Sequence, residues 1–191
     1  MLDETLLMEE IRQWSLNVIE NPMEDFNDLP ACPFAKNSWD QNRVKVVVGE
    51  GGLWTDLIDY IKNFDDSYDV VVYCATDYDE ISAEDVAERI DILNKEAVKK
   101  DLWVMGSHPD TVIDHAATQV NFNPLFDDDY YQIFVQRLGT LVKASNSILK
   151  KGYYKNYNTK DFHSLITKRK LLWQEWTNQK SLSVAVKKPK S

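Results

Sequence analysis

Apolar side chains near the N-terminus recur with the period of an amphipathic helix. Their intervals of three or four residues place them on one face of a helix predicted over residues 3–20. These residues are Leu7, Ile11, Trp14 and Val18. The helix is expected to end at Asn21, because a residue that precedes proline is displaced from the α region. Residues 23–42 contain many turn formers and are interpreted as a linker.

Two patterns alternate in the middle of the chain. Short runs rich in β-branched and other apolar residues are typical of buried strands, and the segments between them carry apolar residues at helical spacing. The strand-like runs are 43–49, 69–75 and 102–106, and the helical segments are 53–64 and 82–100. Ser82 with Asp85 resembles a capping box, which predicts a cap at the start of the second of these helices. Strands joined by helices in this order form right-handed crossover units. We therefore predict an α/β fold with a small, mainly parallel sheet of three or four strands and packed helices.

The last third of the chain has weaker strand signals and stronger helical ones. Residues 117–122 have the pattern of an edge strand, and an antiparallel edge there defines the alternative fold, a ferredoxin-like α+β arrangement. Helices are predicted over 130–150 and 161–177. The tail from Ser181 onward is expected to be disordered.

Charge divides the chain into two parts. Residues 1–149 carry a net charge of −18 and residues 150–191 carry +9. We interpret residues 1–150 as a single α/β domain that includes the N-terminal helix, and residues 151–191 as a basic amphipathic helix with a flexible tail. The apolar face of that helix, which includes Trp173, is expected to pack on the acidic domain, on a protein partner or on a second copy of the chain. Nucleic acid is not expected as a partner, because the acidic domain repels phosphates.

Composition excludes several classes of protein. The 191 residues include 43% apolar and 28% charged residues, which is typical of a globular chain and not of a fibrous or disordered one. Two cysteines are too few for a disulfide scaffold. No apolar run reaches the ~20 residues of a membrane span, and the N-terminus lacks the basic region of a signal peptide. We therefore expect a cytoplasmic protein that has no membrane partner.

Two short motifs contain the residues best suited to chemistry. His108 and Asp110 follow the third predicted strand, where ligand sites of α/β sheets gather, and a carboxylate beside a histidine holds the imidazole in one tautomer. Cys32 lies at a turn near Lys36, which can lower the pKa of a thiol. Cys74 lies inside a predicted strand and is assigned to the core.

These motifs resemble those of a family of small bacterial proteins catalogued as a domain of unknown function. The family carries CPFA-K near the N-terminus and SFHPD in the second half, and the resemblance extends over about residues 10–145. Two features differ, because Ser107 stands where the family has Phe and the turn after HPD is shorter here. The positions of the motif that match are Cys32, Pro33, Phe34, Ala35, Lys36, Arg43, His108, Pro109, Asp110, Asn123, Pro124 and Arg137. The resemblance implies a shared site without naming a reaction or a cofactor.

Three functions fit this set of residues. The first is an enzyme acting on an anionic metabolite, with Cys32 as nucleophile, His108 as general base and Asp110 as its orienting carboxylate. In this hypothesis the substrate is bound by basic and polar groups. These are Lys36, Arg43, Asn123 and Arg137. The alternatives are a non-catalytic adaptor, in which both motifs are rigid turns, and a metal-binding protein that uses Cys32, His108 and Asp110.

Overall fold

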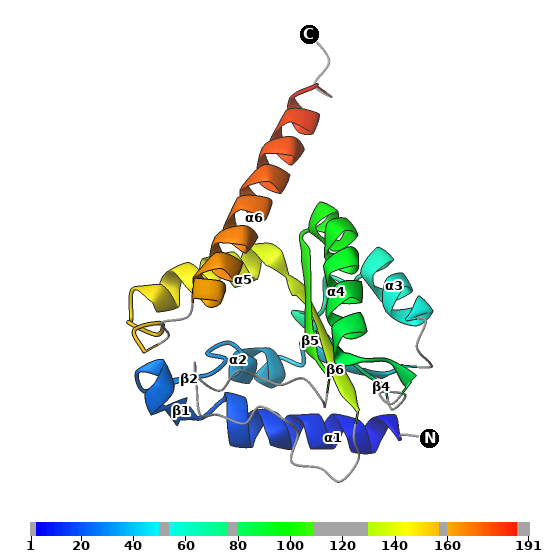
Figure 1. Cartoon of the computed structure of the whole chain (residues 1–191), viewed down its shortest axis with the longest axis vertical. Coiled ribbons are helices and arrows are strands. Elements are labelled where there is room, and N and C mark those ends of the chain that lie inside the picture. The colour runs from blue at the N-terminus through cyan, green and yellow to red at the C-terminus, as the bar shows by residue number, and fades with distance from the viewer. Residues whose placement is uncertain (1–2, 50–53, 76–79, 109–129, 157–159, 187–191) are drawn as a thin grey trace.

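A four-stranded sheet lies at the centre of the molecule, which is known from a computed structural model. The structure describes residues 3–49, 54–75, 80–108, 130–156 and 160–186. The strands are β3 (Val44–Val48), β4 (Val70–Ala75), β5 (Leu102–Ser107) and β6 (Tyr131–Arg137), in the order β3-β4-β6-β5. β3 and β4 are parallel, whereas β6 is antiparallel to both of its neighbours (Figure 1). The α/β class is confirmed, but the prediction of a mainly parallel sheet is wrong, because the sheet is mixed.

The antiparallel strand β6 replaces the first part of the helix predicted over 130–150. Only Leu138–Leu149 is helical, as α5. In Tyr131–Arg137 alternate side chains face the same core, which is the period of a strand. These side chains are Tyr131, Ile133 and Val135. Because β6 inserts between β4 and β5, those two strands point the same way without being neighbours. The predicted edge strand over 117–122 lies outside the described residues.

One face of the sheet is covered by α3 (Thr55–Lys62) and α4 (Ala83–Ala97), which continues into the short 3-10 helix η4 (Val98–Lys100). The Ser82 side chain accepts a hydrogen bond from the Asp85 amide, so the predicted cap at the start of α4 is confirmed. Apolar side chains from both helices and from the strands form the largest core here. This side of the sheet is called the α4 face.

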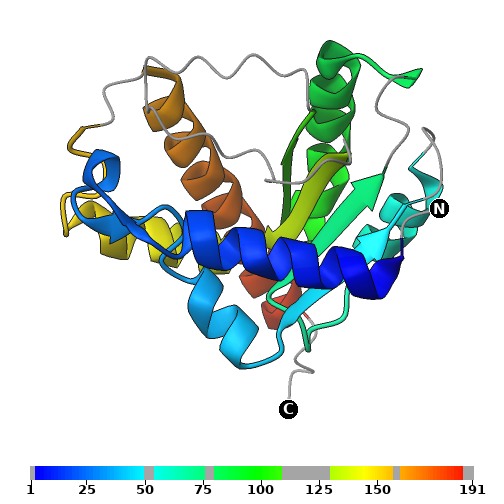
Figure 2. The same cartoon turned by 90° about the horizontal axis from the view of Figure 1, so that it is seen from below.

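The opposite side of the sheet, called the α1 face, is covered by α1 (Glu4–Trp14), which continues as the π-helix η1 (Ser15–Ile19). Figure 2 shows α1 lying across the strands. The predicted face of this helix packs on β3 and β4. The predicted linker contains a two-strand hairpin and two short helices. They are β1 (Pro22–Met23), η2 (Glu24–Phe26), β2 (Leu29–Pro30) and α2 (Ala35–Asp40).

The C-terminal helix α6 (Lys160–Val186) packs on α5 and on the end of α4 through apolar side chains of its first half. Trp176 also donates from Nε1 to the Lys99 carbonyl oxygen at 3.2 Å. The helix extends to Val186, well beyond the predicted end, so the expectation of a disordered segment from Ser181 is wrong for Ser181–Val186; residues 187–191 lie outside the described part. Within the described residues, no helix combines the length and the apolar character needed to cross a membrane.

Candidate functional site

Strand direction places the predicted site residues at two different edges of the sheet. The strands β3, β4 and β5 all point from an amino edge, where Arg43 precedes β3, to a carboxyl edge, where His108 follows β5. Arg137 lies at the amino edge as well, because β6 runs in the opposite direction. A six-residue strand is about 20 Å long. His108 and the two arginines therefore lie at opposite ends of the strands.

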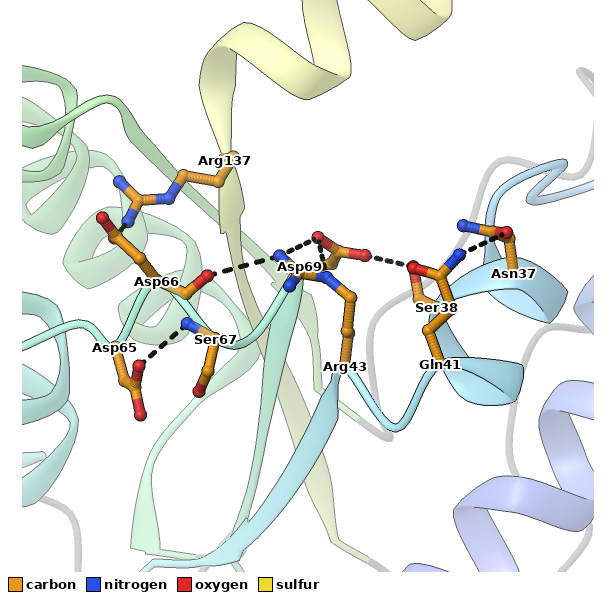
Figure 3. A network of polar contacts seen from close by, with 9 residues as sticks. All are labelled: Asn37, Ser38, Gln41, Arg43, Asp65, Asp66, Ser67, Asp69 and Arg137. Atoms are coloured by element: carbon orange, nitrogen blue, oxygen red, sulfur yellow. Dashed lines mark hydrogen bonds and ion pairs between the residues drawn. The ribbon is translucent and has the colours of Figure 1, made fainter.

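At the amino edge, Arg43 is bound by an aspartate of the same chain. Its Nε donates to Asp69 Oδ1 at 2.9 Å, and its Nη2 lies 2.8 Å from the same oxygen (Figure 3). The other carboxylate oxygen accepts from the Ser38 hydroxyl at 3.0 Å. The hydrogen bond to Asp69 raises the pKa of Arg43, which is the effect of a neighbouring anion on a cation.

Arg137 is engaged in the same way by the turn that precedes β4. Its Nη2 is paired with Asp66, and Nη1 donates to the Lys100 carbonyl oxygen at 3.3 Å. The guanidinium lies 4.7 Å above the Phe64 ring. Figure 3 shows both arginines reaching toward the loop that carries Asp66 and Asp69. The two predicted anion clamps are thus brought together, but each already holds a carboxylate of this chain.

Lys36, the other cation of the predicted binding set, has a partner of its own. Lys36 pairs with Asp40 one turn along α2, at 2.8 Å, and both side chains are exposed. Asn123 and Asp110 lie outside the described residues. In this structure the predicted cationic set therefore forms no site around Cys32 or His108.

Cys32 and His108 make their contacts with different cores. The Cys32 backbone amide donates to the Ile19 carbonyl oxygen at 2.8 Å, and Ile19 packs into the core beneath α1. His108, in contrast, stacks on Tyr131, which belongs to the core of the α4 face. A shared cleft was expected for Cys32 and His108, but among the described residues no contact brings the two side chains together.

The environment of the Cys32 thiol also differs from the expectation of a lowered pKa. Burial has the largest effect on the Cys32 thiol and raises its pKa. Hydrogen bonds from the Phe34 and Ala35 amides lower the pKa by less than burial raises it, and the negative charge of Glu20 adds the smallest increase. A thiol with a raised pKa is a poor nucleophile near neutral pH. Cys74 lies in the core as predicted, fully buried, and burial raises its pKa strongly.

His108 lies at the carboxyl edge among aromatic rings. It is only 2% exposed, and its imidazole stacks on the Tyr131 ring with centroids 6.4 Å apart and planes 22° apart. The Tyr131 hydroxyl accepts a hydrogen bond from Trp54 Nε1 at 2.8 Å, and both rings are buried. This bond connects the start of β6 to the residue before α3, and the Tyr131 ring that it holds is the one that stacks on His108.

Trp54 has an unusual backbone for a large residue. It precedes the first turn of α3 with φ 51° and ψ 30°, in the left-handed region that is uncommon outside glycine. Such strain persists only where surrounding contacts hold it, and it clusters at functional sites. The hydrogen bond to Tyr131 and burial of the indole supply those contacts. Arg89, from α4, places its guanidinium 5.6 Å from the Trp54 ring, so a cation lies at this edge.

A second hydrogen-bonded pair lies beside the first. The Tyr73 hydroxyl donates to Asp56 Oδ1 at 3.0 Å, which joins the end of β4 to the first turn of α3. The backbone of Gly49 lies against the Tyr73 ring so closely that an added Cβ would fall 2.0 Å from Cζ. Among the described residues, the carboxyl edge thus combines the imidazole of His108, the carboxylate of Asp56, the phenols of Tyr73 and Tyr131, the Trp54 indole and the Arg89 guanidinium.

Sequence reasoning identified His108 at this edge but missed the residues around it. Trp54, Tyr73 and Tyr131 look like ordinary core aromatics in the sequence, because each has apolar neighbours at strand or helical spacing. One signal was present for Trp54, which lies where a glycine-rich turn after a strand leads into a helix. The predicted connection from strand to helix is confirmed, since β3 ends at Val48 and α3 begins at Thr55.

A shallow hollow of about 450 Å³ between η4 and α6 contains none of the predicted site residues. Its lining is Lys99, Lys100, Trp176, Gln179 and Lys180. Lys99 is paired with Glu96 at 2.5 Å and Lys100 donates to the Lys62 carbonyl oxygen at 2.5 Å, so neighbouring groups of the protein hold both ammonium groups. In the described part of the chain, no group of three or more histidine, cysteine, aspartate or glutamate side chains is arranged to hold a metal ion.

Comparison of the chain with protein-family models, with curated proteins and with solved structures gives no match. The resemblance to the family with CPFA-K and SFHPD motifs therefore stays a prediction. By its fold and by this edge of the sheet, the chain is a mixed-sheet α/β protein with a buried histidine that packs on an aromatic ring at the carboxyl edge.

Proposed function

We propose that this protein is a cytoplasmic enzyme that binds an anionic metabolite at the carboxyl edge of its sheet and uses His108 to transfer a proton. The observation that carries the proposal is the packing of His108 on Tyr131, which Trp54 fixes through a buried hydrogen bond. Ligands of open α/β sheets bind outside the carboxyl ends of parallel-running strands, which is where these residues lie.

The charge and chemistry of this edge support an anionic substrate. Arg89 brings positive charge next to the Trp54 ring, and a guanidinium recognises carboxylates and phosphates. An imidazole is the side chain best suited to take up or release a proton near neutral pH. The mechanism assigns no part to the thiol, because among the described residues no contact joins Cys32 to His108 and burial raises the pKa of Cys32. Both cysteines are free, which agrees with a reducing compartment such as the cytoplasm.

The experiment uses the three anions inorganic phosphate, citrate and adenosine monophosphate as probes. We expect at least one to shift the His108 ring resonances in a saturable way and to raise the melting temperature. His163, which is exposed on α6, is the internal reference. The Arg89→Met variant should weaken binding, whereas His163→Asn should leave it unchanged.

Two results would contradict the proposal. One is a set of titrations in which His108 and His163 respond alike, which indicates non-specific screening. The other is saturable binding that Arg89→Met leaves intact, which indicates that the anion binds elsewhere. An anion found to bind in this way identifies a chemical class of candidate substrates. Members of that class are then assayed for proton exchange at their acidic C–H positions.

A further inference from the structure

Arg169, on α6, is a buried charge. The residue is only 8% exposed, although arginine is almost never this buried without a partner. It lies on the side of α6 that packs against the domain, between the apolar positions Leu165 and Leu172 of that face. Leucine or methionine would fill such a position without burying a charge. The presence of a guanidinium there therefore calls for an explanation.

The surroundings of Arg169 contain aromatic rings and no acid to neutralise it. Its guanidinium carbon lies 5.4 Å from the centroid of the Trp103 ring, and Tyr154 is near enough to interact electrostatically. Among the described residues no carboxylate pairs with Arg169, and its Nε is a buried donor without an acceptor. Burial lowers the pKa of Arg169, but a guanidinium stays protonated in proteins. The charge is therefore present and unpaired.

Trp103 adds a second donor in the same condition. The residue is 3% exposed, and its Nε1 hydrogen is buried without an acceptor. Lys168 places its ammonium 5.9 Å from the same ring. The carboxylate nearest to Lys168 is Asp91, at 3.6 Å, and that pair is exposed on the outer side of α4 and α6. Two cations thus lie near one ring, and two of the buried donors there, Arg169 Nε and Trp103 Nε1, have no acceptor among the described residues.

Leaving such donors unpaired is unfavourable, because a buried polar group without a hydrogen bond loses its hydration and gains nothing in return. Unpaired buried groups of a native protein commonly mark the place of an ion. We propose that Arg169 and Trp103 form a binding site for an oxyanion, the phosphate or carboxylate group of a ligand, which Lys168 helps to neutralise. The forked guanidinium and a single N–H donor suit an acceptor with several oxygens.

This oxyanion site is separate from the carboxyl edge. Trp103 packs with Leu138 and Val142 under α6, whereas His108 belongs to the α4 face and stacks on Tyr131. An anion bound here would join α6 to β5. The domain and the basic helix are then held together by a ligand in addition to their apolar contact, and occupancy would control how firmly α6 is docked.

The experiment titrates the full chain with sodium phosphate and, separately, with sodium acetate, each against sodium chloride of the same ionic strength. The probe is the indole N–H resonance of Trp103, which a Trp103→Phe variant assigns. We expect phosphate or acetate to shift this resonance in a saturable way and chloride to leave it unmoved. Arg169→Met should weaken the binding about tenfold to a hundredfold, the loss expected for a hydrogen bond between charged groups. Lys170→Met, an exposed neighbour on the same helix, is the matched control.

The stability of the variants provides an independent measurement. Without added oxyanion, Arg169→Met should melt no lower than the unmodified protein, because it removes an unpaired buried charge. In the Arg89→Met background, which weakens binding at the carboxyl edge, the increase in melting temperature with phosphate or acetate should disappear when Arg169→Met is added and persist when Lys170→Met is added. Equal effects of chloride and both oxyanions on the Trp103 resonance would overturn the proposal, and so would an anion response of the Trp103 resonance that Arg169→Met retains. Because the readout lies at Trp103, its failure leaves the proposal for His108 untouched.

Discussion

The two edges of the sheet use their polar groups in opposite ways. At the amino edge, Arg43 and Arg137 are each paired with an aspartate of the same chain, in an arrangement partly open to solvent. At the carboxyl edge, His108 lies beside the buried Trp54–Tyr131 hydrogen bond. The two arginines of the amino edge are therefore already paired within the chain, whereas the carboxyl edge holds a histidine packed against buried aromatic side chains. An arginine that already holds a carboxylate of its own chain, as Arg43 and Arg137 do, has less capacity to bind an anion from solution.

Removing the Trp54 side chain is expected to have the largest effect, and it tests whether the packing of Trp54 stabilises the carboxyl edge. Trp54→Ala should lower the free energy of unfolding by about 3–5 kcal/mol, the usual cost of removing a buried aromatic side chain. Urea unfolding measures this. Phe34→Ala, at an exposed aromatic position of the CPF motif, is the control and should change little. Similar losses for both variants would show that Trp54 has no special structural role.

The next test separates the hydrogen bond from the packing. Tyr131→Phe removes the hydroxyl that accepts from Trp54 and leaves a buried N–H without a partner, at a cost of about 1–3 kcal/mol. The Trp54→Phe, Tyr131→Phe double variant should lose less stability than the two single variants together, because the second change removes no further bond. Additive losses would mean that the two groups do not interact.

Cys32 belongs to neither edge, and its raised pKa predicts a smaller effect. Alkylation near pH 7 should be slow for both Cys32 and Cys74 in the folded protein and fast for both in urea. The folded state holds its thiol protons more tightly than the unfolded state. The free energy of unfolding should therefore fall as pH rises above the ordinary thiol pKa of about 8.5.

Cys32→Ala should reduce that pH dependence, and Cys74→Ala provides the comparison for a thiol deep in the core. Rapid labelling of Cys32 in the folded protein at neutral pH would contradict the raised pKa and make Cys32 a candidate nucleophile again.

The last prediction concerns the amino edge, where a double substitution is expected to change stability least and to test whether the aspartates keep the arginines from binding anions. Exchanging Asp66 and Asp69 for asparagine removes both internal anions and leaves Arg43 and Arg137 as cations without carboxylate partners. The double variant should gain saturable phosphate binding, followed through the backbone amide of Ser67, which the unmodified protein lacks. Phosphate binding by the unmodified protein at Ser67 would show that this edge was open from the start.

The strands and helices that follow a single periodicity could be predicted from the sequence. The first helix, the cap at Ser82 and the burial of Cys74 depend on neighbours a few positions away, and all three are confirmed. β6 could not be found in the same way. Its alternating residues run directly into α5, which begins at Leu138 with no intervening turn, so a helical period fits the combined stretch.

For the candidate site, sequence alone located His108 after a strand, because the end of a buried strand and the residue that follows it are local features. Its companions come from distant segments: Trp54 and Tyr131 are joined by a single long-range hydrogen bond. Cys32 and His108 were grouped because their two motifs resemble those of one family, whereas the contacts of each residue, with Ile19 and with Tyr131, become known only from the tertiary structure.

The sequence by itself determined the first helix, the strands β3, β4 and β5 with the helices between them, which faces of these elements are apolar and how charge divides the chain, since all of these follow from the order of neighbouring side chains. The tertiary structure decided which of the charged and polar groups have partners. It paired Arg43 and Arg137 with aspartates, enclosed Arg169 without one and set His108 against Tyr131. The physical reason is that burial and ion pairing depend on contacts between residues far apart in the chain, and periodicity carries no information about which distant residue a side chain will meet.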